Sequence, residues 1–224
     1  MISPPIVRLH QVSKSFGSLE APTPVLREVD LTIRAGDKVS LIGPSGSGKS
    51  TLLSLIAGLL RPTAGTVEVD GIEMGRLDDR HRAHLRAERI GIALQADNLI
   101  PFLSARENVE LALAFGSRRS ARDARVRALE LLERFEVAHR ADHRPRHLSG
   151  GEAQRVALAV SMANEPALLL ADEVVAQLDS GTAARVVDAV LTAEFAVLFV
   201  SHDAALADLV ERRFALVDSG LVSR

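Results

Sequence analysis

The stretch that decides the fold is residues 38–51: Lys38-Val39-Ser40-Leu41-Ile42-Gly43-Pro44-Ser45-Gly46-Ser47-Gly48-Lys49-Ser50-Thr51. The apolar run 38–42 predicts a short buried strand, and the residues from Ser50 to Leu60 predict a helix. The glycines between them let the backbone curl, so that successive N–H groups point toward one place. Because the N-terminus of a helix is also positive, this strand, loop and helix together predict a binding site for an anion.

The spacing of the glycines, Lys49 and Ser50 matches the phosphate-binding loop of nucleotide-binding proteins. We expect the Lys49 ammonium to contact the β- and γ-phosphates of ATP. The Ser50 hydroxyl is expected to bind Mg²⁺, a cation that prefers oxygen ligands. A plain glycine turn that caps a helix is the alternative, but such a turn does not require a lysine and a serine at these offsets. The motif by itself predicts nucleotide binding through residues 43–51.

Short apolar segments alternate with helical patterns on both sides of this loop. Residues 7–12 and 26–33 alternate apolar and polar side chains at period two, which predicts an antiparallel β part near the N-terminus. The apolar runs 167–171 and 197–200 are separated by a helical pattern over 180–191. That order is typical of an α/β fold with a mainly parallel sheet covered on both faces.

The middle of the chain differs in composition. From about 101 to 147 it is rich in Ala, Leu, Arg and Glu at helical spacing. We interpret this region as an α-helical sub-domain inserted into the α/β core. The predicted organisation is a single domain over 1–224, with its core in 1–94 and 148–224 and the inserted part in about 95–147.

Composition excludes several classes of protein. Lys plus Arg number 27 and Asp plus Glu number 29, so the net charge of −2 gives no reason to expect nucleic-acid binding. The absence of cysteine excludes disulfides, thiol nucleophiles and thiolate metal sites. Apolar runs fall far short of the roughly 18 residues of a membrane span, and the N-terminus lacks a signal pattern. A role at a membrane would therefore require a partner protein.

Two acids, Asp172 and Glu173, follow the apolar run 167–171. The carboxyl end of a parallel strand is where α/β folds bind ligands. Asp172 therefore fits a Mg²⁺ ligand, direct or through water, and Glu173 fits a general base that deprotonates the attacking water. The alternative is an exposed acidic turn after a strand, which is common in proteins. The phosphate loop upstream favours the catalytic interpretation.

A second glycine-rich motif, Leu148-Ser149-Gly150-Gly151-Glu152, precedes another helical pattern. Ser149 is expected to cap that helix. The two glycines leave backbone N–H groups open, so the motif is a second candidate anion site without a lysine of its own. A simple helix cap is the alternative interpretation.

Taken together, these motifs and their order resemble the ABC transporter ATPases over essentially the whole chain. The second glycine motif is similar to the signature of that family. The resemblance implies that Gln95 approaches Mg²⁺ and the attacking water, and that His202 contacts the γ-phosphate. It also implies that Phe16 stacks on adenine and that Asp179 lies in a loop crossing a dimer interface.

The resemblance further implies how the protein works. Two copies pack head-to-tail as a homodimer, and each ATP lies between the phosphate loop of one copy and the signature of the other. ATP binding and hydrolysis close and open this dimer, and separate integral membrane subunits receive the movement. The protein is then a Mg²⁺-dependent ATPase in the cytoplasm, peripheral on the inner face of the cell membrane.

Stretches such as Asn98-Leu99-Ile100-Pro101, together with Glu152 in the signature, are similar to one branch of the family. This branch holds the ATPases of lipoprotein-releasing systems and macrolide exporters, which implies export, lipoprotein extraction or transmembrane mechanotransmission. Val174-Val175 stands where the family has Pro-Thr, which leaves the backbone less fixed and bears on the rate of hydrolysis. A regulatory subunit that binds ATP with weak turnover is therefore an alternative. A soluble ATPase of this type acting on nucleic acid is another.

Overall fold

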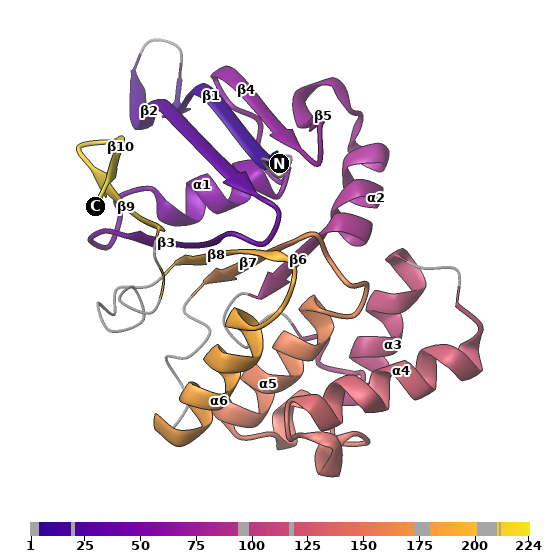
Figure 1. Ribbon diagram of the computed structural model, residues 1–224. Helices are drawn as coiled ribbons and strands as arrows, with labels where there is room; N and C mark the ends of the chain where they lie inside the picture. The colour runs from indigo at the N-terminus through magenta and orange to yellow at the C-terminus, as the bar shows by residue number, and fades with distance from the viewer. Residues whose placement is uncertain are drawn as a thin grey trace. The chain divides into compact units, whose positions relative to one another are not determined.

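The computed structural model describes residues 5–18, 21–93, 99–116, 119–172, 180–200, 210 and 212–224 (Figure 1). The chain divides into two compact units. The first unit is Met1–Arg86 together with Glu194–Arg224, and the second is Ala87–Ala193.

The first unit holds most of the strands. Its elements are β1 (Pro5–Gly17), β2 (Pro22–Arg34), β3 (Lys38–Ile42), α1 (Lys49–Ile56), β4 (Ala64–Val69), β5 (Ile72–Glu73), the 3-10 helix η1 (Met74–Arg76), most of α2 (Asp79–Arg89), β8 (Ala196–Val200), β9 (Arg212–Val217) and β10 (Gly220–Ser223). One sheet has the antiparallel order β2-β1-β4-β5, so the predicted antiparallel part is confirmed. Strand β3 pairs in parallel with both β8 and β9, and β10 pairs antiparallel with β9.

Burial explains why these segments form these elements. Strand β3 buries Val39, Ser40 and Leu41 in succession, because it has parallel neighbours on both sides. Helix α1 buries Leu52, Leu53, Leu55 and Ile56 and packs against β4. In Figure 1, α1 lies between the antiparallel sheet and β3. The start of α1, where the predicted phosphate loop ends, is thus anchored in the core of the first unit.

Helix α1 ends at Ile56, so the predicted end at Leu60 is wrong. Gly58 adopts a left-handed conformation with φ +67°. The Gly58 N–H donates to Leu55 O at 3.1 Å, and the Leu59 N–H donates to Ser54 O at 2.9 Å. This pair of bonds is the Schellman motif, which closes a helix with a left-handed glycine. The apolar residues beyond Gly58 continue the helical pattern in sequence only.

The second unit is mainly helical. Its elements are β6 (Ile90–Ala93), α3 (Ala105–Gly116), α4 (Ala121–Arg134), the 3-10 helices η3 (Ala138–Arg140) and η4 (Pro145–His147), α5 (Gly150–Ser161), β7 (Leu168–Asp172) and α6 (Ser180–Leu191). Strands β6 and β7 pair in parallel. Helices α3, α4 and α5 contact one another, and α5 also contacts β6. Helices α3 and α4 fall inside the region for which the sequence predicts a helical sub-domain.

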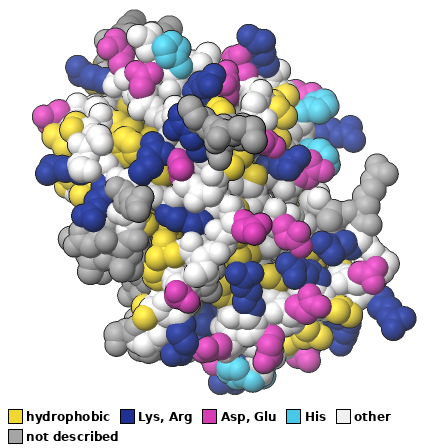
Figure 2. All heavy atoms as spheres, viewed as in Figure 1, with side chains coloured by type: hydrophobic (Ala, Val, Ile, Leu, Met, Phe, Trp, Pro, Cys, Tyr) yellow, Lys and Arg dark blue, Asp and Glu magenta, His cyan; other side chains and the backbone are white. Residues whose placement is uncertain are grey.

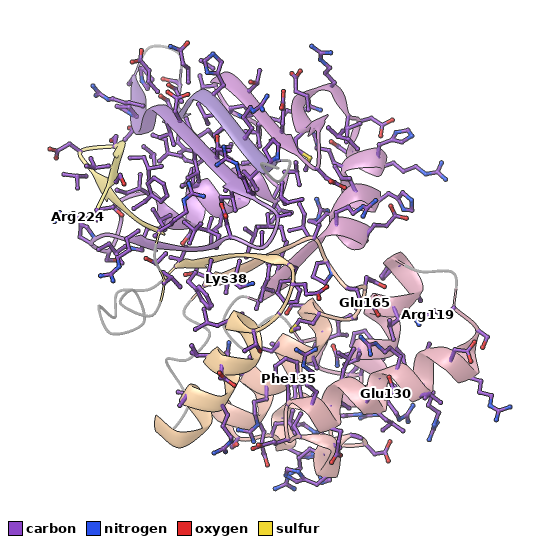
Figure 3. All side chains as sticks on the ribbon, viewed as in Figure 1. Lys38, Arg119, Glu130, Phe135, Glu165 and Arg224 are labelled. Carbon is purple, nitrogen blue, oxygen red and sulfur yellow. The ribbon has the colours of Figure 1, made fainter. Side chains whose placement is uncertain are left out.

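Close packing fixes α5 against β6. A Cβ on Gly91 of β6 would lie 2.3 Å from the Ser161 carbonyl oxygen at the end of α5, so this approach requires glycine. Phe135, the C-cap residue of α4, is buried among the helices of this unit (Figure 3). Glu165 forms ion pairs with Arg119, just before α4, at 3.6 Å and with Arg127 of α4 at 3.2 Å, which tie the segment after α5 to this part of the chain.

The surface carries charges of both signs. On the face drawn in Figure 2, Lys and Arg side chains are interspersed with Asp and Glu, in keeping with the net charge of −2. Within the described ranges, none of the helices is both long enough and apolar enough to cross a membrane.

Candidate functional site

The predicted phosphate loop joins β3 to α1, as the sequence predicts. Gly48 is the N-cap residue of α1 with φ +102°, and a Cβ there would lie 2.9 Å from Val25 Cγ1 on β2. A Cβ on Gly43 would lie 2.8 Å from Ser47 Oγ. Both positions therefore require glycine. The exposed tip of the loop is formed by Pro44, Ser45 and Gly46.

Lys49 is the first residue of α1, and its side chain folds back over the loop. Its Nζ donates to the carbonyl oxygens of Gly43 at 2.7 Å and Pro44 at 2.9 Å. The one ammonium of the motif is thus held at the loop, beside the positive end of the helix dipole. This arrangement places positive charge where the sequence predicts a phosphate.

Ser47 supplies a test of whether the loop suits a nucleotide. Among the residues that the structure describes, its Oγ is buried without a hydrogen-bond partner. A buried hydroxyl without a partner costs free energy, and such groups deserve a functional explanation. The Ser47 hydroxyl could donate a hydrogen bond to a phosphate oxygen, and the Lys49 ammonium could form an ion pair with the phosphate. These two groups therefore fit ATP. Ser50 is exposed and Thr51 is half-buried, both on the first turn of α1.

Phe16 lies at the end of β1, where it pairs with Thr23 of β2, and its side chain is an exposed large apolar group at 43%. The Lys14 Nζ lies 5.0 Å from the centre of the Phe16 ring and also donates to Arg61 O at 2.9 Å. The strand β2 that pairs with Phe16 also contacts Gly48 through Val25. The exposed ring and the phosphate loop therefore both border β2, as an adenine-stacking role would require.

The signature motif begins helix α5 in the second unit. Ser149 is the N-cap residue, and its Oγ accepts a hydrogen bond from the Glu152 N–H at 3.2 Å, so the predicted capping is confirmed. The Glu152 carboxylate accepts in return from the Ser149 N–H at 2.8 Å, which completes a capping box. Gly150 and Gly151 are the first two residues of the helix, the former exposed and the latter half-buried.

Glu152 is held from a second side by a residue that the sequence analysis missed. Arg140 Nε donates to Glu152 Oε1 at 2.8 Å, and His139 Nε2 lies 3.4 Å from the same oxygen. The hydrogen bond from the Ser149 N–H, followed by that from Arg140, lowers the pKa of Glu152 to about 2. Arg140 is twelve positions before Glu152, across η4, and no regular spacing in the sequence indicates this contact.

Asp172 is the last residue of β7 and is half-buried. It therefore stands at the carboxyl end of a parallel strand, where the sequence predicts it. Glu173, Gln95, Asp179 and His202 lie outside the described residues, as does Val174-Val175.

The predicted Mg²⁺ ligands are spread over both units and the undescribed part of the chain. Ser50 belongs to the first unit, Asp172 to the second, and Gln95 is outside the described residues. Within the described ranges, groups of three or more His, Asp or Glu side chains placed to hold a metal ion are absent.

Comparison with known proteins places this geometry in context. A family model described as "ABC transporter" matches residues 26–176. The lipoprotein-releasing system ATP-binding protein LolD 2 of Rhodospirillum rubrum is 42% identical, over 98% of this chain and 97% of that protein. An uncharacterized ABC transporter ATP-binding protein of Methanocaldococcus jannaschii, MJ0796, is also 42% identical, over 95% of this chain and 94% of its own length.

Solved structures similar to this chain are also ATP-binding cassettes of ABC transporters. The dimeric structure of the ATP-binding cassette MJ0796 in a post-hydrolysis state, bound to ADP and Pi, has a TM-score of 0.92 and 40% identity, covering 97% of each chain. A second dimeric structure of this cassette has a TM-score of 0.90. The comparisons confirm the predicted fold and the predicted similarity to lipoprotein-releasing ATPases.

Proposed function

The chain belongs to the ABC transporter family, and from this premise we propose that it hydrolyses ATP to power lipoprotein release through separate membrane subunits. The observation that carries the proposal is the phosphate loop, in which the Lys49 ammonium is held over the Gly43 and Pro44 carbonyls. The names of the relatives in Rhodospirillum rubrum and Legionella pneumophila, both ATP-binding proteins of lipoprotein-releasing systems, support the substrate class.

The phosphate loop binds the ATP phosphates in this proposal. Lys49 pairs with the β- and γ-phosphates, and the Ser47 hydroxyl donates to a phosphate oxygen. The Phe16 ring stacks on the adenine, and the Lys14 ammonium lies over the Phe16 ring. Loss of the Lys49 charge would remove the one ammonium that the loop holds, so ATP affinity depends on it directly.

The predicted ligand set suits Mg²⁺ on the chemistry of its donors. Ser50, Asp172 and Gln95 supply hydroxyl, carboxylate and amide oxygens, which are ligands that Mg²⁺ prefers. The ion, when bound, neutralises charge on the phosphate oxygens. Glu173 takes a proton from the attacking water as the water oxygen forms a bond to the γ-phosphorus. The bond from that phosphorus to the bridging oxygen breaks, ADP leaves, and His202 contacts the γ-phosphate.

A head-to-tail homodimer completes each ATP site. The open N–H groups of Gly150 and Gly151 begin a helix capped by Ser149, and the positive end of that helix suits the γ-phosphate of ATP held by the other copy. Asp179 lies at the interface. The dimeric state of the MJ0796 cassette supports this arrangement. Because ATP contacts both copies, it stabilises the closed dimer by mass action.

Movement then passes to the membrane subunits. In the proposed organisation, the region of about 95–147 is the helical sub-domain that these subunits contact, and Gln95 links it to the nucleotide. The protein works in the cytoplasm, peripheral on the inner face of the membrane.

Lys49→Met tests the nucleotide site, with Lys38→Met as the matched control. Lys38 lies on the same strand-loop unit, but its ammonium donates to the Phe195 carbonyl. We expect Lys49→Met to weaken binding of a fluorescent ATP analogue at least tenfold, and Lys38→Met to leave it within about threefold of wild type. Equal affinities of the two variants would contradict the proposed site.

Co-purification tests the transport role. The tagged chain, extracted in mild detergent from its own cells, is expected to bring down integral membrane proteins and to turn over ATP faster with them than alone. Recovery of ribosomes or nucleic acid in place of membrane proteins would contradict the proposal.

A further inference from the structure

Glu152 raises an electrostatic problem for the proposed function. Its carboxylate sits at the N-terminus of α5, in the motif that is proposed to meet the phosphates of ATP. A negative charge there strengthens the helix cap but repels an anion. The side chain is 12% exposed, so water screens the charge only in part. A cation beside Glu152 would offset this repulsion of the ATP phosphates.

Arg140 is in place to supply that charge. Its Nε donates to Glu152 Oε1 at 2.8 Å, while Glu152 Oε2 accepts from the Ser149 N–H at 2.8 Å. The carboxylate is therefore fixed at both oxygens, one by the signature backbone and one by the guanidinium. His139 Nε2, at 3.4 Å from Oε1, is a third and more exposed neighbour.

Arg140 is itself held in position by local hydrogen bonds. Its N–H donates to Val137 O at 2.9 Å, and its carbonyl accepts from the His143 N–H at 2.8 Å. Its Nη1 lies 3.5 Å from His143 Nε2. Residues 138–143, which we call the connecting segment, thus form a tight turn with Arg140 at its centre.

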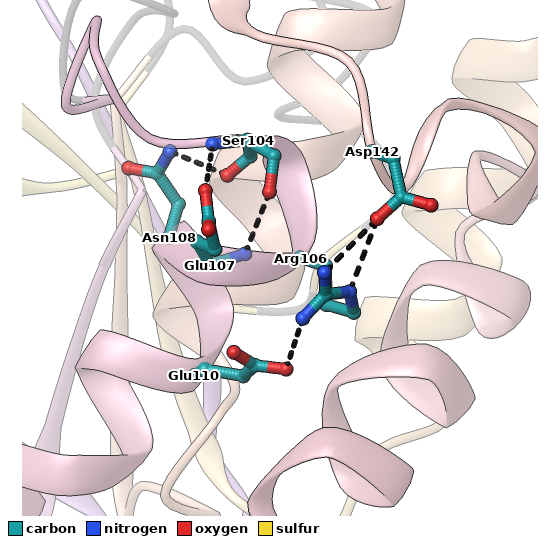
Figure 4. Close-up of polar contacts among 6 residues, drawn as sticks. All are labelled: Ser104, Arg106, Glu107, Asn108, Glu110 and Asp142. Carbon is teal, nitrogen blue, oxygen red and sulfur yellow. Dashed lines mark hydrogen bonds and ion pairs between the residues drawn. The ribbon is translucent and has the colours of Figure 1, made fainter.

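The connecting segment is tied to the start of α3 as well. The Ala105 N–H donates to His143 O at 2.8 Å, and the Arg106 N–H donates to Ala141 O at 2.9 Å. Figure 4 shows the Arg106 guanidinium between Asp142, at 3.0 Å, and Glu110, at 2.7 Å. The turn that carries Arg140 is therefore held by hydrogen bonds to α3 that do not involve the signature. These bonds fix the backbone from which the Arg140 guanidinium reaches Glu152.

We propose that Arg140 is a positioning residue for ATP: its guanidinium holds the Glu152 carboxylate in the capping box and compensates its charge where the signature meets the phosphates. The proposal rests on the proposed function, in which the signature binds ATP across the homodimer. Arg140 acts through Glu152 and does not contact the nucleotide. Two consequences separate this role from a general structural one.

The first consequence is that only the dimer step depends on Arg140. The phosphate loop binds nucleotide within one copy, and the signature acts on ATP of the other copy. Arg140→Gln should therefore leave the affinity of the monomer for a fluorescent ADP analogue unchanged. It should raise the dissociation constant of the ATP-bound dimer about tenfold.

The second consequence is rescue. Glutamine at position 152 can still close the capping box and carries no charge. The double variant Arg140→Gln/Glu152→Gln should therefore recover dimer formation to within about threefold of the parent. A loss caused by misfolding of the connecting segment would not respond to a change at position 152.

The experiment measures ATP-dependent dimerisation by sedimentation, with all variants in a Glu173→Gln background, which is expected to abolish hydrolysis. The matched control is Arg127→Gln on α4, which removes ion pairs to Glu130 of the same helix at 3.3 Å and to Glu165, after α5, at 3.2 Å, and which should leave dimerisation unchanged. Circular dichroism checks that each variant is folded.

Selective weakening by Arg140→Gln with rescue by Glu152→Gln would support the proposal. Dimerisation of Arg140→Gln equal to the parent would overturn it, and so would weakening without rescue. If the parent itself binds no nucleotide or never dimerises with ATP, the proposed function fails, and the role of Arg140 fails with it.

Discussion

Replacing Gly48 by alanine tests whether the phosphate loop has the backbone that the structure gives it. The residue has φ +102°, and an added Cβ would lie 2.9 Å from Val25 Cγ1, 3.1 Å from Leu26 Cδ2 and 3.2 Å from the Val25 carbonyl oxygen. Val25 is β-branched and Gly48 is buried, so neither side yields easily. The substitution therefore combines backbone strain with overpacking.

The two costs can be separated with Gly46→Ala. Gly46 also has a left-handed conformation, φ +78°, but an added Cβ meets nothing within 4 Å. A left-handed alanine costs about 1–2 kcal/mol, and overpacking costs about 1–3 kcal/mol more. We expect Gly46→Ala to lose about 1–2 kcal/mol of unfolding free energy and Gly48→Ala roughly 2–5 kcal/mol.

Urea titration of the nucleotide-free variants, followed by circular dichroism, measures both losses. Equal losses in the two variants would refute the packing of Gly48 against β2. A loss in neither variant would refute the left-handed conformation of the loop.

Three further predictions concern polar groups. Ser47→Ala should leave the free energy of unfolding within about 0.5 kcal/mol of wild type, because its buried Oγ has no partner among the described residues, yet it should weaken ATP binding severalfold. A stability loss in urea above about 1 kcal/mol would show that this hydroxyl is hydrogen-bonded in the free protein. Asn108→Ala should cost about 2–4 kcal/mol, because the 5% exposed Asn108 side chain accepts from one backbone N–H and donates to three carbonyls between residues 100 and 104. Thermal unfolding measures that loss, and an unchanged midpoint would contradict it. Glu152 has a pKa lowered from 4.5 to about 2, so its charge stabilises the fold fully above pH 4.5 and progressively less as the pH falls toward 2. The difference in unfolding free energy between wild type and Glu152→Gln should therefore be constant above about pH 5 and shrink below it, and a difference that grows on acidification would contradict the assignment.

Local patterns predicted the elements that carry the site. The apolar run 38–42 predicted the strand, and the glycines after it predicted the loop. A loop this tight leaves no room for a Cβ at some positions, so it requires glycine there. The helix over 180–191 has its predicted ends. Ser149 and Glu152 are three residues apart, so the capping box could be predicted from their spacing alone.

Two elements, α2 and the C-terminal hairpin, could not be predicted from the sequence patterns. Helix α2 has few apolar residues, and the sequence analysis did not identify it, since its amphipathic face is narrow. At the C-terminus, Asp218 and Ser219 adopt φ +48° and +68° and turn the chain back, so that β9 and β10 form an antiparallel pair. Such a pair of left-handed residues is typical of a tight hairpin.

Arg140 marks the limit of reading motifs. Its contact with Glu152 depends on how residues 138–143 turn and on their bonds to α3. Those bonds join residues 35 or more positions apart, for example Arg106 and Ala141, and no periodic pattern records them. The sequence thus predicts the signature motif and its helix cap. Only the structure shows that Arg140 pairs with the Glu152 carboxylate.

The central claim is that this chain is an ATP-hydrolysing engine that closes as a dimer. The most direct test measures ATP turnover and ATP-dependent dimerisation of the purified chain beside Glu173→Gln. We predict that wild type hydrolyses ATP, whereas Glu173→Gln hydrolyses none but accumulates as an ATP-bound dimer. A wild-type chain that binds ATP yet neither hydrolyses it nor dimerises, even with its membrane subunits present, would contradict the claim.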